Sequence, residues 1–107
     1  MKVYNKLVRD KIPEIIESKN EKCTTKVLNE QDYLKELNIK LQEEVKEYLE
    51  SGEIEELADM EEVLRAILDF KKVPYADFEV LRIKKAVKRG AFKNKIFLIS
   101  TEECGDR

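Results

Sequence analysis

The chain contains no histidine, and only two cysteines, two prolines and three glycines occur among its 107 residues. Without histidine, Ser-His-Asp and Cys-His catalysis, HExxH zinc sites and imidazole proton transfer are excluded. Any chemistry must use carboxylates, lysines, tyrosines or water held by a metal ion. Cys23 and Cys104 match no metal or redox motif, so we expect reduced, inert thiols.

Long apolar runs are also missing. No stretch approaches the roughly 18 apolar residues of a membrane span, and the first residues lack the charged-then-apolar order of a signal peptide. We therefore expect a cytoplasmic protein with no membrane partner. The net charge is only −2, and no base-stacking motif is present, so we also expect no nucleic-acid partner.

Charge is abundant but unevenly distributed. Charged residues make up 41% of the chain, against about a quarter in typical domains, which suits exposed helices. Acidic residues are concentrated in 43–62, whereas basic residues are concentrated in 2–11 and 82–95. An acidic centre between basic ends suits a metal ion with a phosphate-bearing ligand, although solvated helix faces explain many individual charges.

The order of apolar and capping residues predicts one mainly α-helical domain, bundle-like, with four helices. The expected helices cover residues 11–19, 29–49, 53–71 and 75–88. Asp10 and Asn29 are expected N-caps, and Gly52 is an expected helix stop. The apolar and β-branched content of 24–28 and 95–100 predicts two short strands, which we expect to pair antiparallel and to bring the two cysteines near each other.

Two pairs of carboxylates flank Gly52. Glu44 and Glu47 precede it, and Glu56 and Asp59 follow it at a similar distance. Residues three apart are neighbours on a helix surface, so each pair presents its oxygens on one face. A tight turn at Gly52 would bring both pairs to the same height on antiparallel helices. Converging carboxylates repel each other unless cations neutralise them, and hard oxygens suit Mg²⁺, with Mn²⁺ as a substitute. The spacing therefore predicts a metal site formed by these four residues.

Helical phase distinguishes these carboxylates from their neighbours. At about 100° per residue, Glu56 projects inside the apolar arc of its helix, with Asp59 close to it. Glu44 lies near the edge of the apolar stripe on the preceding helix, whereas Glu43 is expected to face solvent. Carboxylates on a packing face are rarely buried unpaired, because desolvating the charge is costly. The phase therefore supports a cation-binding role for the inward-facing residues.

Three segments of the chain resemble one family. The sequences EEVKE at 43–47 and ELAD at 56–59 are similar to the EExxE…ExxD signature of the all-α nucleoside triphosphate pyrophosphohydrolases. That group includes the MazG proteins, the all-α dUTPases and dCTPases, and phosphoribosyl-ATP pyrophosphohydrolase. The opening YNKLVRDKIP at 4–13 and the closing segment at 88–98 resemble a small MazG-like subgroup that cleanses nucleotide pools. The separation between the two acidic motifs, residues 48–55, is shorter than is usual in the family.

The resemblance implies a MazG-type domain that cleaves a nucleoside triphosphate between its α- and β-phosphates. It also implies that the four carboxylates hold Mg²⁺ and that Glu44 or Glu47 accepts a proton from the attacking water. Polar groups near both ends of the chain are then candidates to bind the substrate. These substrate-binding candidates are Lys6, Arg9, Asp10, Arg89 and Lys95. Asp10 can equally be a helix cap.

Two alternative functions stay open on the sequence. Phosphoribosyl-ATP pyrophosphohydrolase uses the same acidic signature, and only the resemblance of the opening segment argues against it. A non-catalytic helical interaction module would instead use the carboxylates in salt bridges, with Lys40 or Lys46 as partners. In either case the central amphipathic helices present more apolar surface than a small domain buries easily, so we expect a homodimer or homotetramer.

Overall fold

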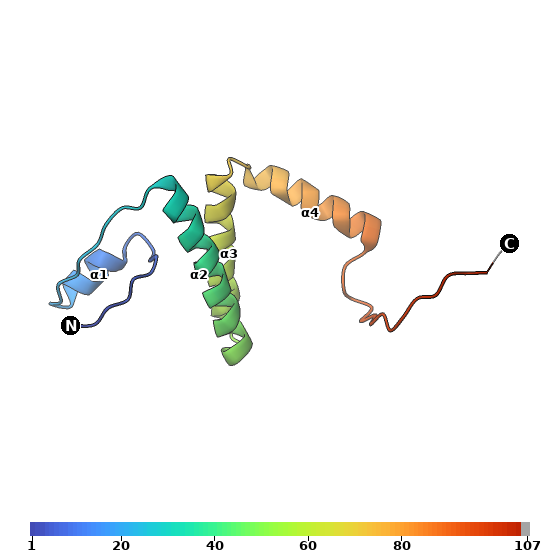
Figure 1. Ribbon diagram of the computed structural model, residues 1–107, viewed down its shortest axis with the longest axis horizontal. Coiled ribbons are helices and arrows are strands. Elements are labelled where there is room, and N and C mark those ends of the chain that lie inside the picture. Colours follow the sequence, from blue (N-terminus) through green and yellow to red (C-terminus); the bar gives the residue numbers. More distant parts are fainter. Residues whose placement is uncertain (106–107) are drawn as a thin grey trace. The chain divides into compact units, whose positions relative to one another are not determined.

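The computed structural model describes residues 1–105, and these form four α-helices without a strand (Figure 1). The helices are α1 (Ile12–Ser18), α2 (Glu30–Ser51), α3 (Ile54–Phe70) and α4 (Tyr75–Arg89). The prediction of a mainly α-helical chain is therefore confirmed, with helix ends within a few residues of those expected. The chain divides into two compact units, residues 1–75 and the residues from 76 onward.

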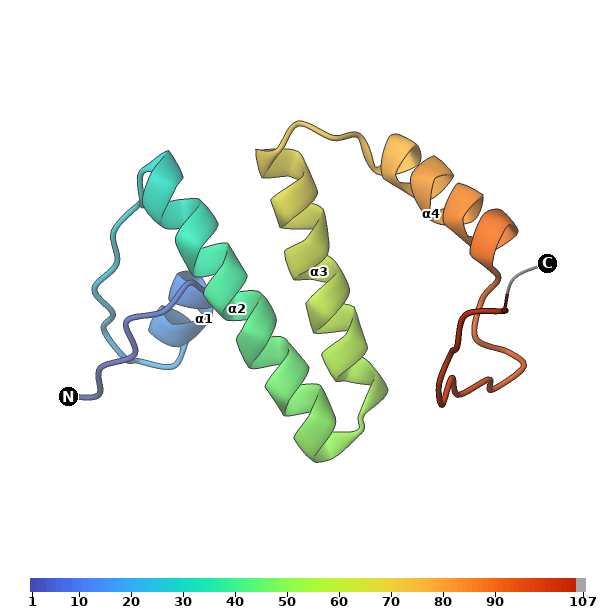
Figure 2. The same ribbon diagram turned by 45° about the vertical axis from the view of Figure 1, so that its right-hand side comes forward.

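The first unit is built around a helical hairpin in which α2 and α3 run antiparallel, side by side (Figure 2). The Asn29 side chain caps α2, as predicted, by accepting a hydrogen bond from the Asp32 N–H at 2.8 Å. At the other end, Gly52 has a φ of 69° and donates its N–H to the Tyr48 carbonyl at 2.7 Å. Glycine adopts this left-handed conformation without steric cost. Only Gly52 and Glu53 separate the helices, so the predicted tight turn is confirmed.

The core of this hairpin is small. Leu37 on α2 is 2% exposed and Val63 on α3 is 8% exposed, and these are the buried apolar side chains of the described chain. At the open end of the hairpin, the rings of Tyr33 and Phe70 meet edge to face with their centroids 5.9 Å apart. Such aromatic pairs add to the stabilisation from burial. Two helices alone cannot enclose their apolar stripes, so the remaining apolar side chains stay partly or fully exposed.

The N-terminal lead-in, residues 1–11, is irregular and continues into the short helix α1. The N-cap of α1 is Lys11, and no side chain caps the helix, so the expectation that Asp10 caps it is wrong. A backbone turn takes the place of a side-chain cap, because the Ile12 N–H donates to the Arg9 carbonyl at 3.1 Å. Pro13 lies in the first turn, as predicted, where its missing N–H leaves no helical hydrogen bond unmade.

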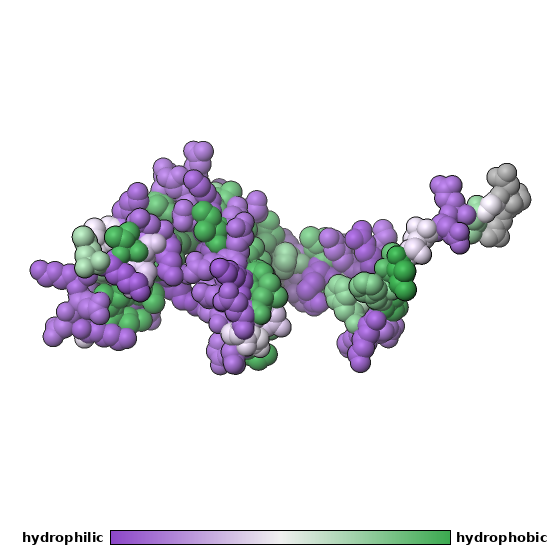
Figure 3. All heavy atoms as spheres, turned by 60° about the horizontal axis from the view of Figure 1, so that its bottom comes forward, coloured by the Kyte–Doolittle hydropathy of each residue, from purple (hydrophilic) through white to green (hydrophobic). Residues whose placement is uncertain are grey.

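The second unit contains nearly all of α4 and an irregular C-terminal segment. Gly90, with a φ of 86°, follows α4 and donates its N–H to the Ala86 carbonyl at 2.8 Å. No residue of α4 is buried. The side chains of residues 96–99 are also largely exposed, and Figure 3 shows hydrophobic residues on the molecular surface. Most large apolar side chains of this unit are therefore exposed.

The predicted pairing of 24–28 with 95–100 is not shown, because both segments are irregular throughout the described residues. A two-stranded pairing is marginal by itself and depends on further packing. Cys23 and Cys104 are free thiols. Among the described helices, none combines the length and apolar composition that crossing a bilayer requires.

Candidate metal centre

Glu44 is the most buried charged residue of the described chain, at 6% exposure. It lies on α2, and its Oε1 is 3.5 Å from the Nζ of Lys40, one turn earlier on the same helix. Its Oε2 is buried without a hydrogen-bond partner. A buried carboxylate oxygen without a partner is costly, so a proton or a cation bound at this atom would stabilise the carboxylate.

Glu56 and Asp59 bring their carboxylates from α3 to Glu44. One oxygen from each of the three residues lies within 4.8 Å of the other two. Oxygen ligands around Mg²⁺ stand at about 2.1 Å from the ion and therefore roughly 3–4 Å from each other. A small inward movement of the side chains would meet that requirement. The structure thus brings three of the four predicted carboxylates together across the Gly52 turn.

The carboxylates of this centre repel each other. Burial first, and then the neighbouring Glu47, raise the pKa of Glu44 above its ordinary value of 4.5. Partial loss of hydration, and again Glu47, raise the pKa of Glu56. Glu47 therefore lies close enough to affect both groups, although it is outside the three residues whose oxygens converge. A cation would relieve this repulsion and favour the ionised carboxylates.

Two basic side chains of the lead-in contact the hairpin. Arg9 Nη2 donates to Asp59 Oδ1 at 2.7 Å, and Lys6 Nζ donates to Glu43 Oε1 at 3.2 Å. Glu43 is more covered than expected, because Lys6 and Lys40 reduce the exposure of its side chain to 28%. Partial burial by itself would raise the pKa of Glu43, but the two lysines outweigh burial and lower it. Helical phase could not show this cover, since Lys6 comes from a distant segment.

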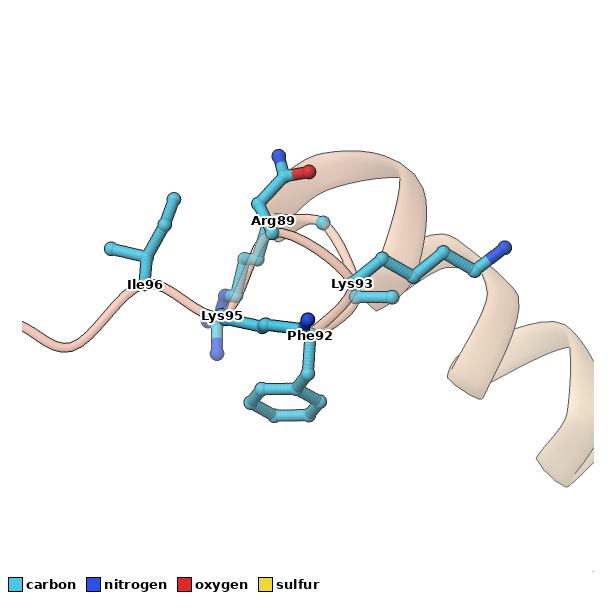
Figure 4. A pocket seen from close by; sticks show the side chains of 8 residues that line it. Arg89, Phe92, Lys93, Lys95 and Ile96 are labelled. Carbon is cyan, nitrogen blue, oxygen red and sulfur yellow. The ribbon is translucent and has the colours of Figure 1, made fainter.

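The other predicted substrate-binding residues lie elsewhere. Asp10 is exposed beside α1. Arg89 and Lys95 belong to the second unit, where both line a hollow formed by residues 89–96 (Figure 4). Lys93 lines the same hollow, and the ring of Phe92 projects from the chain beside it. Three basic residues thus line this hollow of the second unit.

Two further side chains complete the surroundings of the carboxylates. Ser51 Oγ donates to Glu56 Oε1 at 3.4 Å and accepts a hydrogen bond from the Glu53 N–H at 3.1 Å, which ties Glu56 to the turn. Ser51 was not among the predicted site residues, although its place as a polar side chain at the end of α2 could have indicated it. Lys40, expected only as a partner in the salt-bridge alternative, lies one turn before Glu44.

The chemistry of the centre follows from its donor atoms. Carboxylate oxygens are the ligands that Mg²⁺ prefers, and the unpartnered oxygen of Glu44 is the atom that a cation would most relieve. The residues present therefore fit a small divalent cation with a preference for oxygen. In comparisons with known proteins, nothing among protein-family models, curated proteins or solved structures matches the chain.

Proposed function

We propose that the chain is a Mg²⁺-dependent nucleoside triphosphate pyrophosphohydrolase. The reaction would split the bond between the α- and β-phosphates and release a nucleoside monophosphate and pyrophosphate. One observation carries the proposal: a buried, unpartnered oxygen of Glu44 belongs to a carboxylate that converges with those of Glu56 and Asp59. The resemblance of three segments to the MazG-like group supplies the reaction, and it favours cleansing of the cytoplasmic nucleotide pool as the role.

Glu44, Glu56 and Asp59 would hold the metal ion from both helices of the hairpin, with Glu47 beside them. A bound Mg²⁺ would neutralise the charge on phosphate oxygens and activate the attacking water. Glu47 is the better placed proton acceptor, because it is half-buried next to the centre and outside the three converging groups. A carboxylate in this place can accept the proton of the attacking water.

Basic side chains would bind the phosphate groups that the metal does not neutralise. Arg9 and Lys6 already lie on the acidic hairpin. Arg89 and Lys95 share a hollow in the second unit, which makes that hollow a candidate phosphate-binding site in its own right. Arginine suits this task because its planar fork binds two phosphate oxygens at once.

A non-catalytic helical module is the second candidate, and the ion pairs favour it. Arg9 with Asp59, and Lys6 with Glu43, form the salt bridges that such a module would need. These pairs are substantially exposed, and exposed pairs contribute only about 0–1 kcal/mol. They do not explain why Glu44 is buried with an unpartnered oxygen. Hydrolysis of phosphoribosyl-ATP would use the same carboxylates, so that compound belongs in the substrate test.

Self-association is part of the proposal. Most of the large apolar side chains of α4, and those of residues 96–99, are exposed, and a homodimer or homotetramer would cover such surface. We further propose that 24–28 and 95–100 become strands when they pair with each other. Pairing would satisfy their backbone groups and reduce the exposure of the apolar side chains in 96–99.

Release of pyrophosphate from a panel of canonical and modified nucleoside triphosphates and phosphoribosyl-ATP tests the function. Wild type should release pyrophosphate only with Mg²⁺, and Glu56→Gln should reduce the rate by at least about 100-fold, since a ligand carboxylate is lost. Glu61→Gln is the matched control, because Glu61 lies on the same helix but pairs with Arg65. No release from any compound, together with a melting temperature unaffected by Mg²⁺, would contradict the proposal.

A further inference from the structure

Arg9 lies at the edge of the carboxylate cluster in a contact that a metal-binding role alone does not explain. Its guanidinium donates to Asp59 at 2.7 Å, and Asp59 is one of the three residues whose oxygens converge within 4.8 Å. The two residues are 50 positions apart in the sequence. The contact is therefore a product of the tertiary structure and not of local helix geometry.

We propose that Arg9 is an exchangeable counter-cation of the metal centre. In the metal-free protein it neutralises Asp59; binding of a divalent cation displaces it, and the released guanidinium becomes available to a phosphate group. This inference rests on the proposed function, because it presupposes that the three carboxylates bind a divalent cation. The inference adds an order of events to the proposed function: the metal ion binds first and thereby frees the Arg9 guanidinium to bind phosphate.

Electrostatics favours exchange over simultaneous binding. A guanidinium and a divalent cation on the same carboxylate are like charges at contact distance, and they repel each other. The Arg9 side chain is 55% exposed and that of Asp59 is 40% exposed, so the pair is screened by water and easily broken. After its release from Asp59, the guanidinium of Arg9 would be hydrated by solvent. It would therefore not be left buried without a hydrogen-bond partner.

The two edges of the cluster differ in what already neutralises them. At the exposed edge, Arg9 neutralises Asp59. At the buried edge, Lys40 lies near one of the two carboxylate oxygens of Glu44, Oε1. The other oxygen, Oε2, has no hydrogen-bond partner. A divalent cation would therefore gain most at the Oε2 of Glu44, which Lys40 leaves without a partner. At Asp59 it would have to compete with the shorter contact from Arg9, so Arg9 contributes to the cost of metal binding.

The lead-in would keep Arg9 near the cluster after its release. Lys6, three residues earlier, donates to Glu43 at 3.2 Å, and Glu43 is outside the converging carboxylates. This second contact can persist when Asp59 takes a metal ion. Arg9 would then stay tethered beside the metal, where its planar fork can bind two phosphate oxygens.

Calorimetric titration with Mg²⁺ tests the exchange in wild type, Arg9→Gln and Lys11→Gln. Lys11 is exposed and lies two residues further along, so its substitution changes the net charge equally without touching Asp59. We expect Arg9→Gln to bind Mg²⁺ about fivefold more tightly than Lys11→Gln, at the upper end of what an exposed pair contributes. In wild type, the nitrogen-15 side-chain signals of Arg9 should shift as Mg²⁺ is added.

The outcomes separate the exchange from the proposed function. No Mg²⁺ binding in wild type and in Arg9→Gln would overturn both. Equal Mg²⁺ affinities in the two variants, with Arg9 signals in wild type unmoved at saturation, would overturn the exchange alone. With saturating Mg²⁺, inorganic pyrophosphate should bind about tenfold more weakly to Arg9→Gln than to Lys11→Gln, as expected for a lost charge-assisted pair. Equal pyrophosphate affinities would overturn the phosphate-binding step.

Discussion

The middle of α3 and the turn end of the hairpin use similar side chains with opposite results. In the middle of α3, Glu61 Oε2 accepts hydrogen bonds from Arg65 Nε at 3.1 Å and from the Tyr75 hydroxyl at 3.0 Å. The Arg65 guanidinium also lies over the Tyr75 ring, 3.8 Å from its centroid. The hydrogen bond to Glu61 raises the pKa of Arg65. This cluster is exposed and its acid is satisfied.

Near the turn, acid is in excess and partly buried. Glu44, Glu56 and Asp59 converge with Glu47 beside them, and Glu44 Oε2 has no partner. The number of acidic residues alone does not mark a candidate site, because α3 carries acid along its whole length. The turn end differs in that its carboxylates exceed the cations that reach them and that one of them, Glu44, is buried.

The largest expected effect is the stabilisation of the turn end by metal. With Mg²⁺ at about 100 times its dissociation constant, binding should add about 2.7 kcal/mol to the free energy of unfolding. This raises the melting temperature by roughly 10 °C for a chain of this size. Glu56→Gln should abolish the shift and Glu61→Gln should keep it, as measured by differential scanning fluorimetry. If both variants lost the Mg²⁺-induced rise in melting temperature, the proposed difference in metal binding between the two regions would be contradicted.

The second effect concerns the metal-free protein. Glu44→Gln removes a buried charge but keeps the shape of the side chain, so it should raise the free energy of unfolding by roughly 1 kcal/mol. Glu61→Gln removes a satisfied acid and should lower it by about 0.5 kcal/mol. Urea unfolding without metal measures both. A marked loss of stability in Glu44→Gln would show that its carboxylate is already neutralised.

The third effect concerns how the free energy of unfolding depends on pH. Acids whose pKa is raised by folding and acids whose pKa is lowered should change this free energy in opposite directions as pH falls. Burial and Glu47 raise the pKa of Glu44, so the folded state holds that proton more tightly than the unfolded state. Stability of the metal-free protein should therefore rise as pH falls through the raised pKa of Glu44 toward its ordinary value of 4.5. The hydrogen bond from Arg82 lowers the pKa of Glu79, so its contribution should be lost at still lower pH. Urea midpoints measured across this range should rise and then fall, and Glu44→Gln should flatten the rise.

The smallest effect is expected at the satisfied cluster. Tyr75→Phe removes the hydroxyl that donates to Glu61 but keeps the ring under Arg65. Because water can replace an exposed hydrogen bond, the free energy of unfolding should fall by less than about 1 kcal/mol. Mg²⁺ affinity should stay at the wild-type value. A change in Mg²⁺ affinity would mean that the two clusters are coupled.

Local signals predicted the hairpin well. Asn29 caps α2 through a side-chain hydrogen bond, and Gly52 ends it in the left-handed conformation. Both outcomes depend on a few neighbouring residues, which is why they can be read from the sequence. Asp10 does not cap α1, because a backbone turn between Arg9 and Ile12 precedes the helix and no side chain caps it. The paired strands at 24–28 and 95–100 depend on a distant partner, so composition alone could not establish them.

Local signals are sufficient to predict the helices, the position of the turn and the spacing that directs Glu44, Glu56 and Asp59 to one place. These features follow from side-chain periodicity and backbone conformation, which act over a few residues. Which carboxylate oxygen lacks a partner, and which cations reach the acids, depends on the folded arrangement of distant segments. Arg9 reaches Asp59, and Lys6 reaches Glu43, across the fold. Charge neutralisation depends on distance in space, and the sequence does not contain those distances.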